Sequence, residues 1–314
     1  MIKKKKQKAE SATTEKLVTW EALIQAFFQG YGKDAQPEGK KSFSDALSGY
    51  LLQEAAKHSC FKNYNTLILF DNTTLIKADS DKIYRAVSSF PDKNKPVLLV
   101  LVSPGGELGS AYLIGKLCQE FSAEKFIAVV PRHAKSAATL LCCAADEIHM
   151  GSLSELGPID PQINRMPALG LKNSVEHIAD LVSKNPGSSE MFAKYLNLSI
   201  APIQIGYYER VAESAVQYAQ RLLVKITGTQ KMKPDAIAEK LVYGYKDHGF
   251  IIDKEEALEI FGKDKIKSNT AEYDFGSAIY NILSRLEDIA DVMDYNFYFV
   301  GSLADKPGLT KRKK

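Results

Sequence analysis

Short apolar runs alternate with helical segments between residues 65 and 150, and this alternation constrains the fold more than any other feature of the chain. Continuous apolar strands that alternate with helices are typical of a parallel sheet covered on both faces. The sequence therefore predicts an α/β fold with a parallel sheet built from βαβ units. The predicted strands are 65–70 (NTLILF), 96–102, 125–130 and 147–150 (EIHM), and the predicted helices are 80–89, 107–121 and a segment from 136.

The chain changes character after Gly151. Residues 152–170 (SLSELGPIDPQINRMPALG) hold three prolines, and a loop of that length in a compact domain is either disordered or functional. A largely helical C-terminal part follows, with predicted helices over 175–184, 189–196, 205–226, 234–242, 254–261 and 272–289. We expect a basic flexible tail over 1–16, a helical segment over 17–60, the α/β domain over 61–268, and a C-terminal helical extension with a basic tail over 269–314.

The charge balance excludes some classes of partner. The 41 Lys and Arg residues exceed the 38 Asp and Glu residues by three, and part of this excess lies at the two ends, in residues 3–6 and 311–314. The body of the chain is therefore near neutral, which argues against a nucleic-acid groove. No window approaches the roughly 20 apolar residues that span a bilayer, and no apolar run follows the basic start. We expect a cytoplasmic protein without a membrane span and without a nucleic-acid partner.

The four cysteines have no CxxC spacing, and two of them are adjacent within an apolar stretch. This pattern favours buried free thiols over a disulfide framework or a zinc site, and it favours a reducing compartment. No other metal-ligand spacing and no phosphate-binding loop occurs in the sequence. We therefore expect neither a metal nor a cofactor.

Two loops are predicted to meet at one edge of the sheet. The strand 96–102 ends in SPGG (103–106), and the next strand ends just before RHAKSA (132–137). In a right-handed βαβ unit both strands end at the same edge, where ligands bind in open α/β folds. Paired glycines let backbone N–H donors approach a reacting group. Ser136 begins a helix of small residues, so its hydroxyl lies where the helix end favours negative charge. A hydroxyl that faces such donors is the minimum for acyl transfer.

Both segments also have purely structural interpretations. Serine is a common helix N-cap, so Ser136 is also predicted to cap its own helix. The SPGG segment is equally typical of a tight turn. The sequence alone leaves these alternatives open, and the predicted meeting of the two segments favours function.

The same residues carry a family resemblance. The segments SPGGELGSAYLIGKL and PRHAKSAATLLCCAADEIHMGSLSELGPIDPQI closely resemble the serine dehydrogenase proteinase family, relatives of the Clp protease proteolytic subunit and of signal peptide peptidase A within the Clp/crotonase fold. The resemblance covers roughly 65–261. It implies a serine peptidase that acts on a polypeptide substrate, with Ser136 as the nucleophile. It also implies an oxyanion hole formed by the N–H groups of Gly106 and Ala137, with Gly105 allowing the turn.

The general base is not evident from the resemblance. Clp protease has a histidine about 25 residues after its serine, whereas this chain reads GPIDPQ (157–162) there. Signal peptide peptidases use a desolvated lysine from later in the chain. The lysines at a suitable distance are Lys172, Lys184 and Lys194, and Lys184 is favoured, although each also fits an ordinary solvated lysine. His248, in a glycine-flanked turn, is the second candidate for the base.

Other residues have less defined roles. Asp160 is expected to bind substrate or orient the base, or else to form an Asp-Pro turn. His133 is expected to line the site or to pack structurally. Lys135 adjoins Ser136, and its side chain is expected to turn away toward a carboxylate, across a subunit contact. The sequence leaves two other functions open, a catalytically silent scaffold and a crotonase-like acyl-CoA enzyme.

Apolar helices outside the sheet predict a homo-oligomer. The aromatic residues of 17–31 and a continuous stripe along 205–226 exceed what one α/β core needs. The stripe consists of Ile205, Tyr208, Val211, Ala212, Ala215, Tyr218, Ala219 and Leu222. Relatives assemble into rings, so the resemblance implies the same. The sequence does not indicate whether an ATPase delivers substrate.

Overall fold

A computed structural model describes residues 17–163, 166–199, 202–223 and 232–312. The chain forms two compact units, 1–53 and 54–314. The first unit is built from α1 (Trp20–Tyr31) and most of α2 (Pro37–Ala56). Thr19 caps α1 by accepting a hydrogen bond from the backbone N–H of Ala22. The ring of Phe27 packs edge-on against Phe43 at 5.1 Å, so the aromatic residues of this segment form the core of the helix pair.

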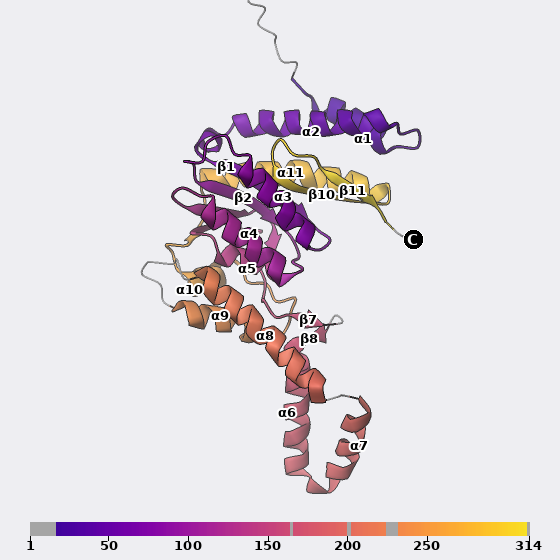
Figure 1. Ribbon diagram of the computed structural model, residues 1–314, viewed down its shortest axis with the longest axis vertical. Coiled ribbons are helices and arrows are strands. Elements are labelled where there is room, and N and C mark those ends of the chain that lie inside the picture. The colour runs from indigo at the N-terminus through magenta and orange to yellow at the C-terminus, as the bar shows by residue number, and fades with distance from the viewer. Residues whose placement is uncertain (1–16, 164–165, 200–201, 224–231, 313–314) are drawn as a thin grey trace, which may run out of the picture. The chain divides into compact units, whose positions relative to one another are not determined.

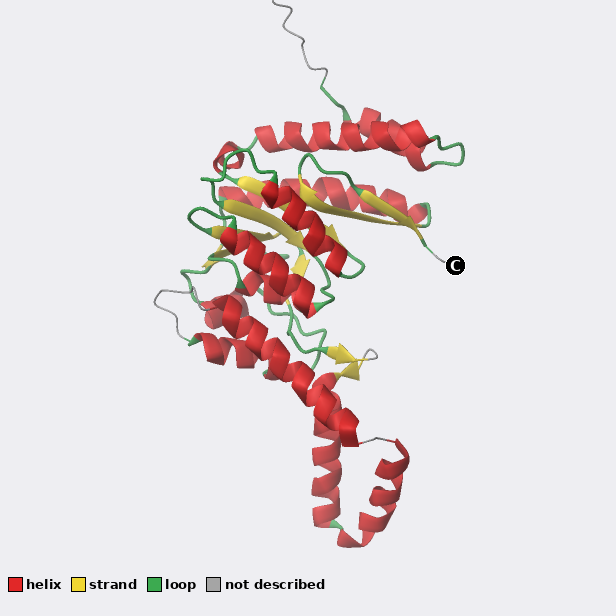
Figure 2. Ribbon diagram, viewed as in Figure 1, coloured by secondary structure: helices red, strands yellow, loops and turns green. Residues whose placement is uncertain are grey.

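A seven-stranded sheet is the centre of the second unit (Figure 2), and the predicted α/β architecture is confirmed. Its strand order is β11-β10-β1-β2-β3-β5-β9. The five strands from β1 to β9 are parallel, whereas β10 and β11 are antiparallel additions. The strands are β1 (Asn65–Asp71), β2 (Val97–Val102), β3 (Phe126–Val130), β5 (Glu147–Met150), β9 (Ile266–Lys267), β10 (Tyr295–Ser302) and β11 (Gly308–Lys311).

The sheet is covered on both faces, as its continuous apolar strands predict. Val100 and Val129 lie against Gly276 of α11 (Ala271–Val292) on one face. Leu99 and its alternate neighbours join a core with Ala111 of α4 on the other face. Helices α3 (Lys77–Ser88), α4 (Leu108–Glu120) and α5 (Ala137–Cys143) belong to this second layer, and Figure 1 shows α3 and α4 across the strands from α11.

The part of the chain after β5 is largely helical, as predicted. It contains α6 (Ala168–Lys184), α7 (Ser189–Ser199), α8 (Pro202–Leu223), α9 (Pro234–Tyr243) and α10 (Lys254–Phe261). A short 3-10 turn, η2 (Pro186–Ser188), lies between α6 and α7, and another, η1 (Ser59–Asn63), precedes β1. The predicted loop over 152–170 instead contains three short strands, β6, β7 and β8, that form two strand pairs. These pairs are β4 (His133–Ala134) with β6 (Glu155–Leu156), and β7 (Gln162–Ile163) with β8 (Met166–Pro167).

Two sequence expectations are corrected by this arrangement. The C-terminal extension is not only helical, because β10 pairs with β1 and buries Phe297 and Phe299. The stripe along α8 was assigned to a subunit contact, yet Ala212, Ala215 and Ala219 are buried in the chain's own core, where α8 packs on α4 and α5. The side chains of Ile205 and Tyr208 lie outside the described residues.

All four cysteines are buried and free, as predicted. Across the described ranges, no helix combines the length and the apolar character needed to cross a membrane. Within the same ranges, no group of three His, Cys, Asp or Glu side chains has the geometry to hold a metal ion.

Candidate active site

Ser136 occupies a strained turn between β4 and α5. Its φ and ψ are 51° and −117°, values that side-chain-bearing residues avoid at a cost of about 1–3 kcal/mol. The turn is closed by a 2.8 Å hydrogen bond from the N–H of Ala138 to the carbonyl of Lys135. The hydroxyl of Ser136 makes no capping hydrogen bond to α5. The alternative that this serine serves as a side-chain N-cap is therefore wrong, and the hydroxyl is available for another partner.

The SPGG segment lies directly against the Ser136 turn, as the crossover argument predicts. Ser103 donates its N–H to His133 O at 3.0 Å and accepts from Lys135 N at 2.9 Å. A Cβ on Gly105 would lie 2.6 Å from the carbonyl oxygen of Lys135 and 2.9 Å from the nitrogen of Ala137. Gly105 has a φ of 101°. Glycine is therefore required here by both conformation and close approach.

Two backbone N–H groups beside Ser136 are left without acceptors. Ala137 is the first residue of α5, and the first N–H groups of a helix have no intrahelical partner. Gly106 has a φ of 152° and is held next to Leu75, which accepts from Glu107 and donates to Gly105. Within the described part of the chain, neither the N–H of Gly106 nor that of Ala137 has a hydrogen-bond acceptor.

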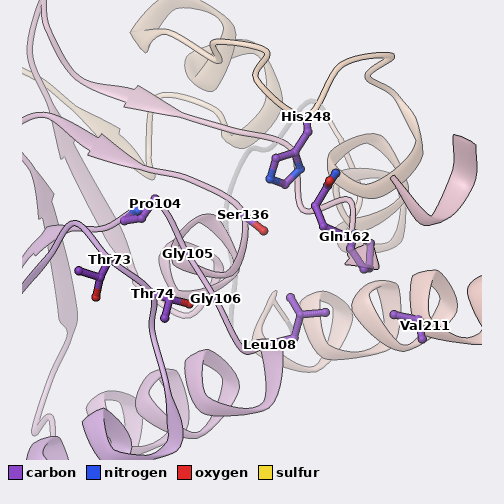
Figure 3. Close-up of a pocket in the computed structure, with 11 residues that line it drawn as sticks. Thr73, Thr74, Pro104, Gly105, Gly106, Leu108, Ser136, Gln162, Val211 and His248 are labelled. Carbon is purple, nitrogen blue, oxygen red and sulfur yellow. The ribbon is translucent and has the colours of Figure 1, made fainter. Parts of the chain in front are cut away.

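The hydroxyl of Ser136 and the imidazole of His248 line one pocket of about 460 Å³. Figure 3 shows both side chains on the same side of this pocket, with Gln162 beside His248. We call it the serine pocket. It is lined by Thr73, Thr74, Pro104, Gly105, Gly106, Leu108, Ser136, Pro161, Gln162, Val211 and His248.

His248 is held by a buried carboxylate. Its Nδ1 lies 2.5 Å from Oδ1 of Asp160, whose exposed fraction is only 6%. The hydrogen bond to Asp160 raises the pKa of His248, and this effect outweighs the opposing effect of burial. Gln162 approaches the other oxygen of Asp160 at 3.4 Å. The arrangement leaves Nε2 of His248 as the ring nitrogen that does not contact Asp160.

The loop that carries Asp160 is fastened to the Ser136 turn. Thr139 of α5 donates its hydroxyl to Ala134 O at 2.6 Å and accepts from Gly157 N at 3.1 Å. Lys135 forms a 3.0 Å ion pair with Glu155. The expectation that Lys135 points to a carboxylate of another subunit is therefore corrected, because its partner lies in the same chain.

The segment that carries His248 is tied to the same loop. Leu156 and Ile252 exchange two backbone hydrogen bonds, at 2.8 and 3.0 Å. The N–H of Ile159 also donates to Leu241 O at 2.8 Å, which anchors the end of α9 beside Asp160. Three segments distant in sequence are thus joined into one rigid frame around the serine pocket.

The other predicted site residues lie elsewhere. Lys184 is exposed at the end of α6 and does not line the serine pocket. Lys194 is also exposed and pairs with Glu190 at 2.8 Å. The side chain of Lys172 lies outside the described residues. His133 does not line the serine pocket, and burial, together with the charge of Arg132, lowers its pKa.

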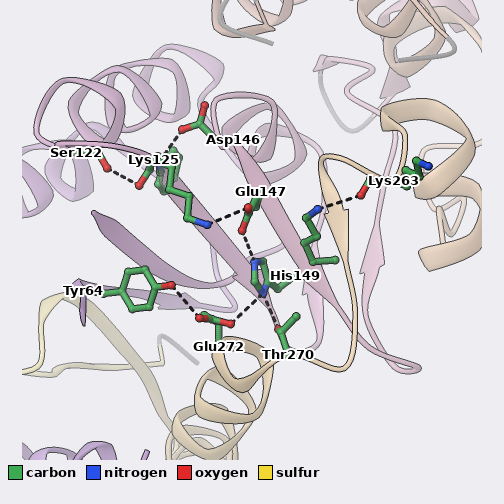
Figure 4. Close-up of polar contacts among 11 residues, drawn as sticks. Tyr64, Ser122, Lys125, Asp146, Glu147, His149, Lys263, Thr270 and Glu272 are labelled. Carbon is green, nitrogen blue, oxygen red and sulfur yellow. Dashed lines mark hydrogen bonds and ion pairs between the residues drawn. The ribbon is translucent and has the colours of Figure 1, made fainter. Parts of the chain in front are cut away.

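A second polar cluster lies apart from this pocket (Figure 4) and connects β5 to α11. His149 is almost fully buried, and its Nδ1 lies 2.6 Å from the hydroxyl of Thr270. Its Nε2 lies 3.1 Å from Glu147, and Lys125 pairs with the same carboxylate at 3.0 Å. These contacts, led by the hydrogen bond from His149, lower the pKa of Glu147 to about 2. Glu272 accepts a 2.8 Å hydrogen bond from Tyr64. The cluster fastens helix and sheet together.

Part of the chain is similar to a known protein family. Residues 69–188 match the model of the ClpP-like SDH-type serine proteinase family. The predicted family resemblance is confirmed. The matched segment contains the SPGG motif, the Ser136 turn and Asp160, whereas His248 lies beyond it.

Two uncharacterized proteins of Methanocaldococcus jannaschii are relatives in sequence. They are 31% and 26% identical over 182 residues, which is 58% of this chain and 57% and 56% of the relatives' own lengths. The chain thus spans little more than half of each relative.

Solved structures give weaker matches. A membrane-bound stomatin-specific protease matches with a TM-score of 0.40 and 15% identity, covering 68% of this chain and 80% of that one. ClpP1 from Listeria monocytogenes matches with a TM-score of 0.39 and 13% identity, covering 67% of this chain and 94% of that one. Scores at this level have no bearing on which residues act.

Several pocket residues were not identified from the sequence. Thr73 and Thr74 follow β1 and reach the serine pocket because β1 ends at the same sheet edge as β2. The strand-end argument that located the SPGG segment applies equally to them. Gln162, two residues after Asp160, lies in β7, a two-residue strand that the sequence pattern does not predict.

Proposed function

We propose that the protein is a serine peptidase that cleaves polypeptides by acyl transfer, with Ser136 as nucleophile, His248 as general base and Asp160 as the residue that orients the base. The observation that carries the proposal is the uncommitted hydroxyl of Ser136 in one pocket with an imidazole whose other nitrogen is bound to a buried carboxylate. A nucleophile, a base and an orienting group are the three parts that this chemistry requires.

The reaction follows from these positions. Oγ of Ser136 attacks the carbonyl carbon of the scissile peptide bond while its proton passes to Nε2 of His248. The C–N bond then breaks, and the same proton passes from Nε2 to the leaving amine. A water molecule next loses a proton to His248 and attacks the ester carbonyl, which releases the acid product and returns the hydroxyl of Ser136.

The N–H groups of Gly106 and Ala137 are proposed to stabilise the oxyanion. Ala137 follows Ser136 in the chain, Gly106 lines the same pocket as Ser136, and neither N–H has an acceptor within the described residues. Preorganised donors of this kind each contribute about 3–4 kcal/mol to lowering such barriers. The strained conformation of Ser136 fits this role, because it places a hydroxyl and an N–H donor on one tight turn.

His248 replaces Lys184 as the preferred base. A lysine base must be kept dry to remain neutral, and Lys184 is exposed. Asp160 holds His248 in one tautomer, which accounts for its burial better than a role in binding substrate. The sequence left two roles open for Asp160, and we assign it the role of orienting the base. We assign His133 no role in binding substrate.

A fluorophosphonate probe tests this proposal, because it labels only an activated serine. We expect labelling of the wild type, none of Ser136→Ala, and at least a hundredfold slower labelling of His248→Ala. Ser214→Ala is the matched control, since this exposed serine donates to the carbonyl of Arg210 and does not line the serine pocket. Normal labelling of His248→Ala together with loss in Lys184→Ala would restore the lysine as base. Absence of labelling in the wild type would favour the silent scaffold.

A homo-oligomer remains part of the proposal. Exposed apolar side chains on α7 and α8, Met191, Tyr195 and Tyr207, support an interface. Light scattering at micromolar concentration is the test. A mass near the 34.7 kDa of one chain, with full activity, would show that no assembly is needed.

A further inference from the structure

A second pocket of about 470 Å³ lies on the outer side of α4, and none of its residues belongs to the proposed catalytic set. We call it the basic pocket. It spans the start of α3, the first two turns of α4 and the last turns of α8. It is lined by Lys77, Glu107, Gly109, Ser110, Tyr112, Leu113, Tyr218 and Arg221.

The basic pocket adjoins the serine pocket along two elements. In the segment 106–109, Gly106 and Leu108 line the serine pocket, whereas Glu107 and Gly109 line the basic pocket. Helix α8 also borders both, through Val211 in the first and Arg221 in the second. A polypeptide that leaves the serine pocket along α8 therefore reaches the basic pocket without crossing another element.

The spacing suits an extended peptide. Val211 and Arg221 are ten residues apart on one helix, which is roughly 15 Å at 1.5 Å per residue. An extended chain covers that span in roughly four to five residues. Measured from Val211, which lines the serine pocket, Arg221 of the basic pocket is thus a few extended residues away along α8.

The charges of the basic pocket are unbalanced. Lys77 and Arg221 are exposed, and within the described ranges neither forms an ion pair. Glu107 is the one acidic side chain among the lining residues, and its carboxylate accepts a 2.8 Å hydrogen bond from the hydroxyl of buried Ser110. The lining residues thus carry two positive charges and one negative charge, and this positive balance favours an anionic ligand.

Two tyrosines form one wall beside these cations. The rings of Tyr112 and Tyr218 lie 4.8 Å apart with an interplanar angle of 34°, and both are half-buried. Leu113, which is half exposed, extends this apolar surface. A ligand that presents a carboxylate on a short aliphatic stem matches this combination of wall and charge.

We propose that the basic pocket binds a glutamate or aspartate side chain of the polypeptide substrate, about four residues from the scissile bond. The inference rests on the proposed peptidase function, because the bound peptide is a substrate only if the protein cleaves it. The binding itself does not require cleavage. It assigns Lys77 and Arg221 as residues that determine substrate specificity.

The test measures binding to the Ser136→Ala protein by fluorescence anisotropy. The probes are labelled twelve-residue peptides of neutral sequence in which glutamate, or glutamine as its uncharged match, is placed at each position in turn. We expect one position, or two adjacent ones, at which glutamate lowers the Kd about fivefold relative to glutamine. Cleavage of the same peptides by the wild type, followed by mass spectrometry, locates the bond and should place that position three to five residues away.

Charge reversal then identifies the pocket. In Lys77→Glu and Arg221→Glu the advantage of glutamate over glutamine should disappear, and the uncharged variant Arg221→Gln should weaken it if charge reversal impairs folding. Arg85→Glu is the matched control, since this exposed arginine lies on α3 but lines neither pocket. An equal Kd for glutamate and glutamine peptides at all positions, or an advantage that survives in Arg221→Glu, would overturn the proposal. Failure of the wild type to cleave any peptide, with the charge-dependent binding intact, would count against the peptidase function alone.

Discussion

Nδ1 of His248 lies 2.5 Å from Oδ1 of Asp160, although the two residues are 88 positions apart in sequence. The chain between them includes α6, α7, α8 and α9, and it returns to the sheet edge through the backbone bonds of Ile252 with Leu156. The geometry of the proposed base therefore depends on the backbone bonds that hold the segment after α9 against the loop that carries Asp160.

The first prediction concerns the pH dependence that this contact creates. The hydrogen bond to Asp160 raises the pKa of His248, and a general base acts only when it is neutral. We therefore expect kcat/KM of peptide hydrolysis to rise with pH through this raised pKa. Asp160→Asn removes the charge, so the acidic limb of the profile should move to lower pH while the maximal rate falls on the order of a thousandfold.

Asp235→Asn is the control for this shift, because Asp235 is exposed at the start of α9 and is not among the groups that shift the pKa of His248. It should change the profile little. An acidic limb that stays in place in Asp160→Asn would mean that another group acts as the base.

The second prediction concerns Gly105. Alanine there adopts an unfavourable positive φ, and its Cβ would lie 2.8 Å from the Cβ of Ser136. We expect Gly105→Ala to lower the free energy of unfolding by about 2–4 kcal/mol, because the backbone must shift away from the Ser136 turn. Peptide hydrolysis should fall at least tenfold at temperatures where the variant is still folded. Urea denaturation and rate measurements check both effects.

Gly206→Ala provides the comparison, since no heavy atom lies within 4 Å of a Cβ at this position in α8. Alanine should leave the rate unchanged and stabilise the helix by up to about 1 kcal/mol. Equal behaviour of the two variants would contradict the close packing inferred for Gly105.

The sequence predicted most of the fold because the strands β1, β2, β3 and β5 are continuous apolar runs that need burial on both faces. It missed β10, since this strand mixes aromatic and polar residues and becomes a strand by pairing with the edge of β1. The two-residue strands β6, β7 and β8 were missed because two residues are too few to show an alternating pattern, and pairing with another segment decides them.

The candidate site was predicted in part. Ser136, Gly105 and Gly106 lie at ends of consecutive parallel strands, and a topological rule brings these ends together. His248 and Asp160 were both named, yet nothing in the sequence indicated that they meet, because the helical part that joins them follows no such rule. The preference for Lys184 rested on distance along the chain, which says little about distance in space.

The third prediction concerns the cluster around Glu147. The pKa of this carboxyl is lowered to about 2, first by the hydrogen bond from His149. A lowered pKa stabilises the fold fully above the ordinary value near 4.5, and this stability is lost as the pH falls from there toward 2. Glu147→Gln should lower the free energy of unfolding at neutral pH by about 1–3 kcal/mol and flatten its decline below pH 4.5. Urea unfolding at several acidic pH values measures this, with the exposed Glu124→Gln as control. An unchanged decline would show that other carboxylates account for acid sensitivity.

The fourth prediction concerns Lys265, a buried lysine behind the helix that Ser136 begins. Its Nζ donates to the carbonyl oxygens of Cys143 at 2.9 Å and of Ala145 at 2.5 Å, and both carbonyls lie at the C-terminal end of α5. Burial lowers the pKa of Lys265 to about 8, from an ordinary value of 10.5. Between these two pH values the unfolded chain binds more protons than the folded protein, so this residue makes stability rise with pH there.

Lys265→Met should remove this contribution. The free energy of unfolding of the wild type should therefore rise relative to that of the variant between pH 8 and 10.5. The substitution should also lower stability at pH 7 by about 1–3 kcal/mol, because two buried carbonyls lose their donor. Lys267→Met, at a partly exposed lysine that donates to the carbonyl of Lys263, is the control and should follow the wild type. If the free energies of unfolding of Lys265→Met and the wild type differ by a constant amount across this pH range, the buried amine does not titrate there. Lys265 would then stay charged while it donates to the carbonyls at the end of α5.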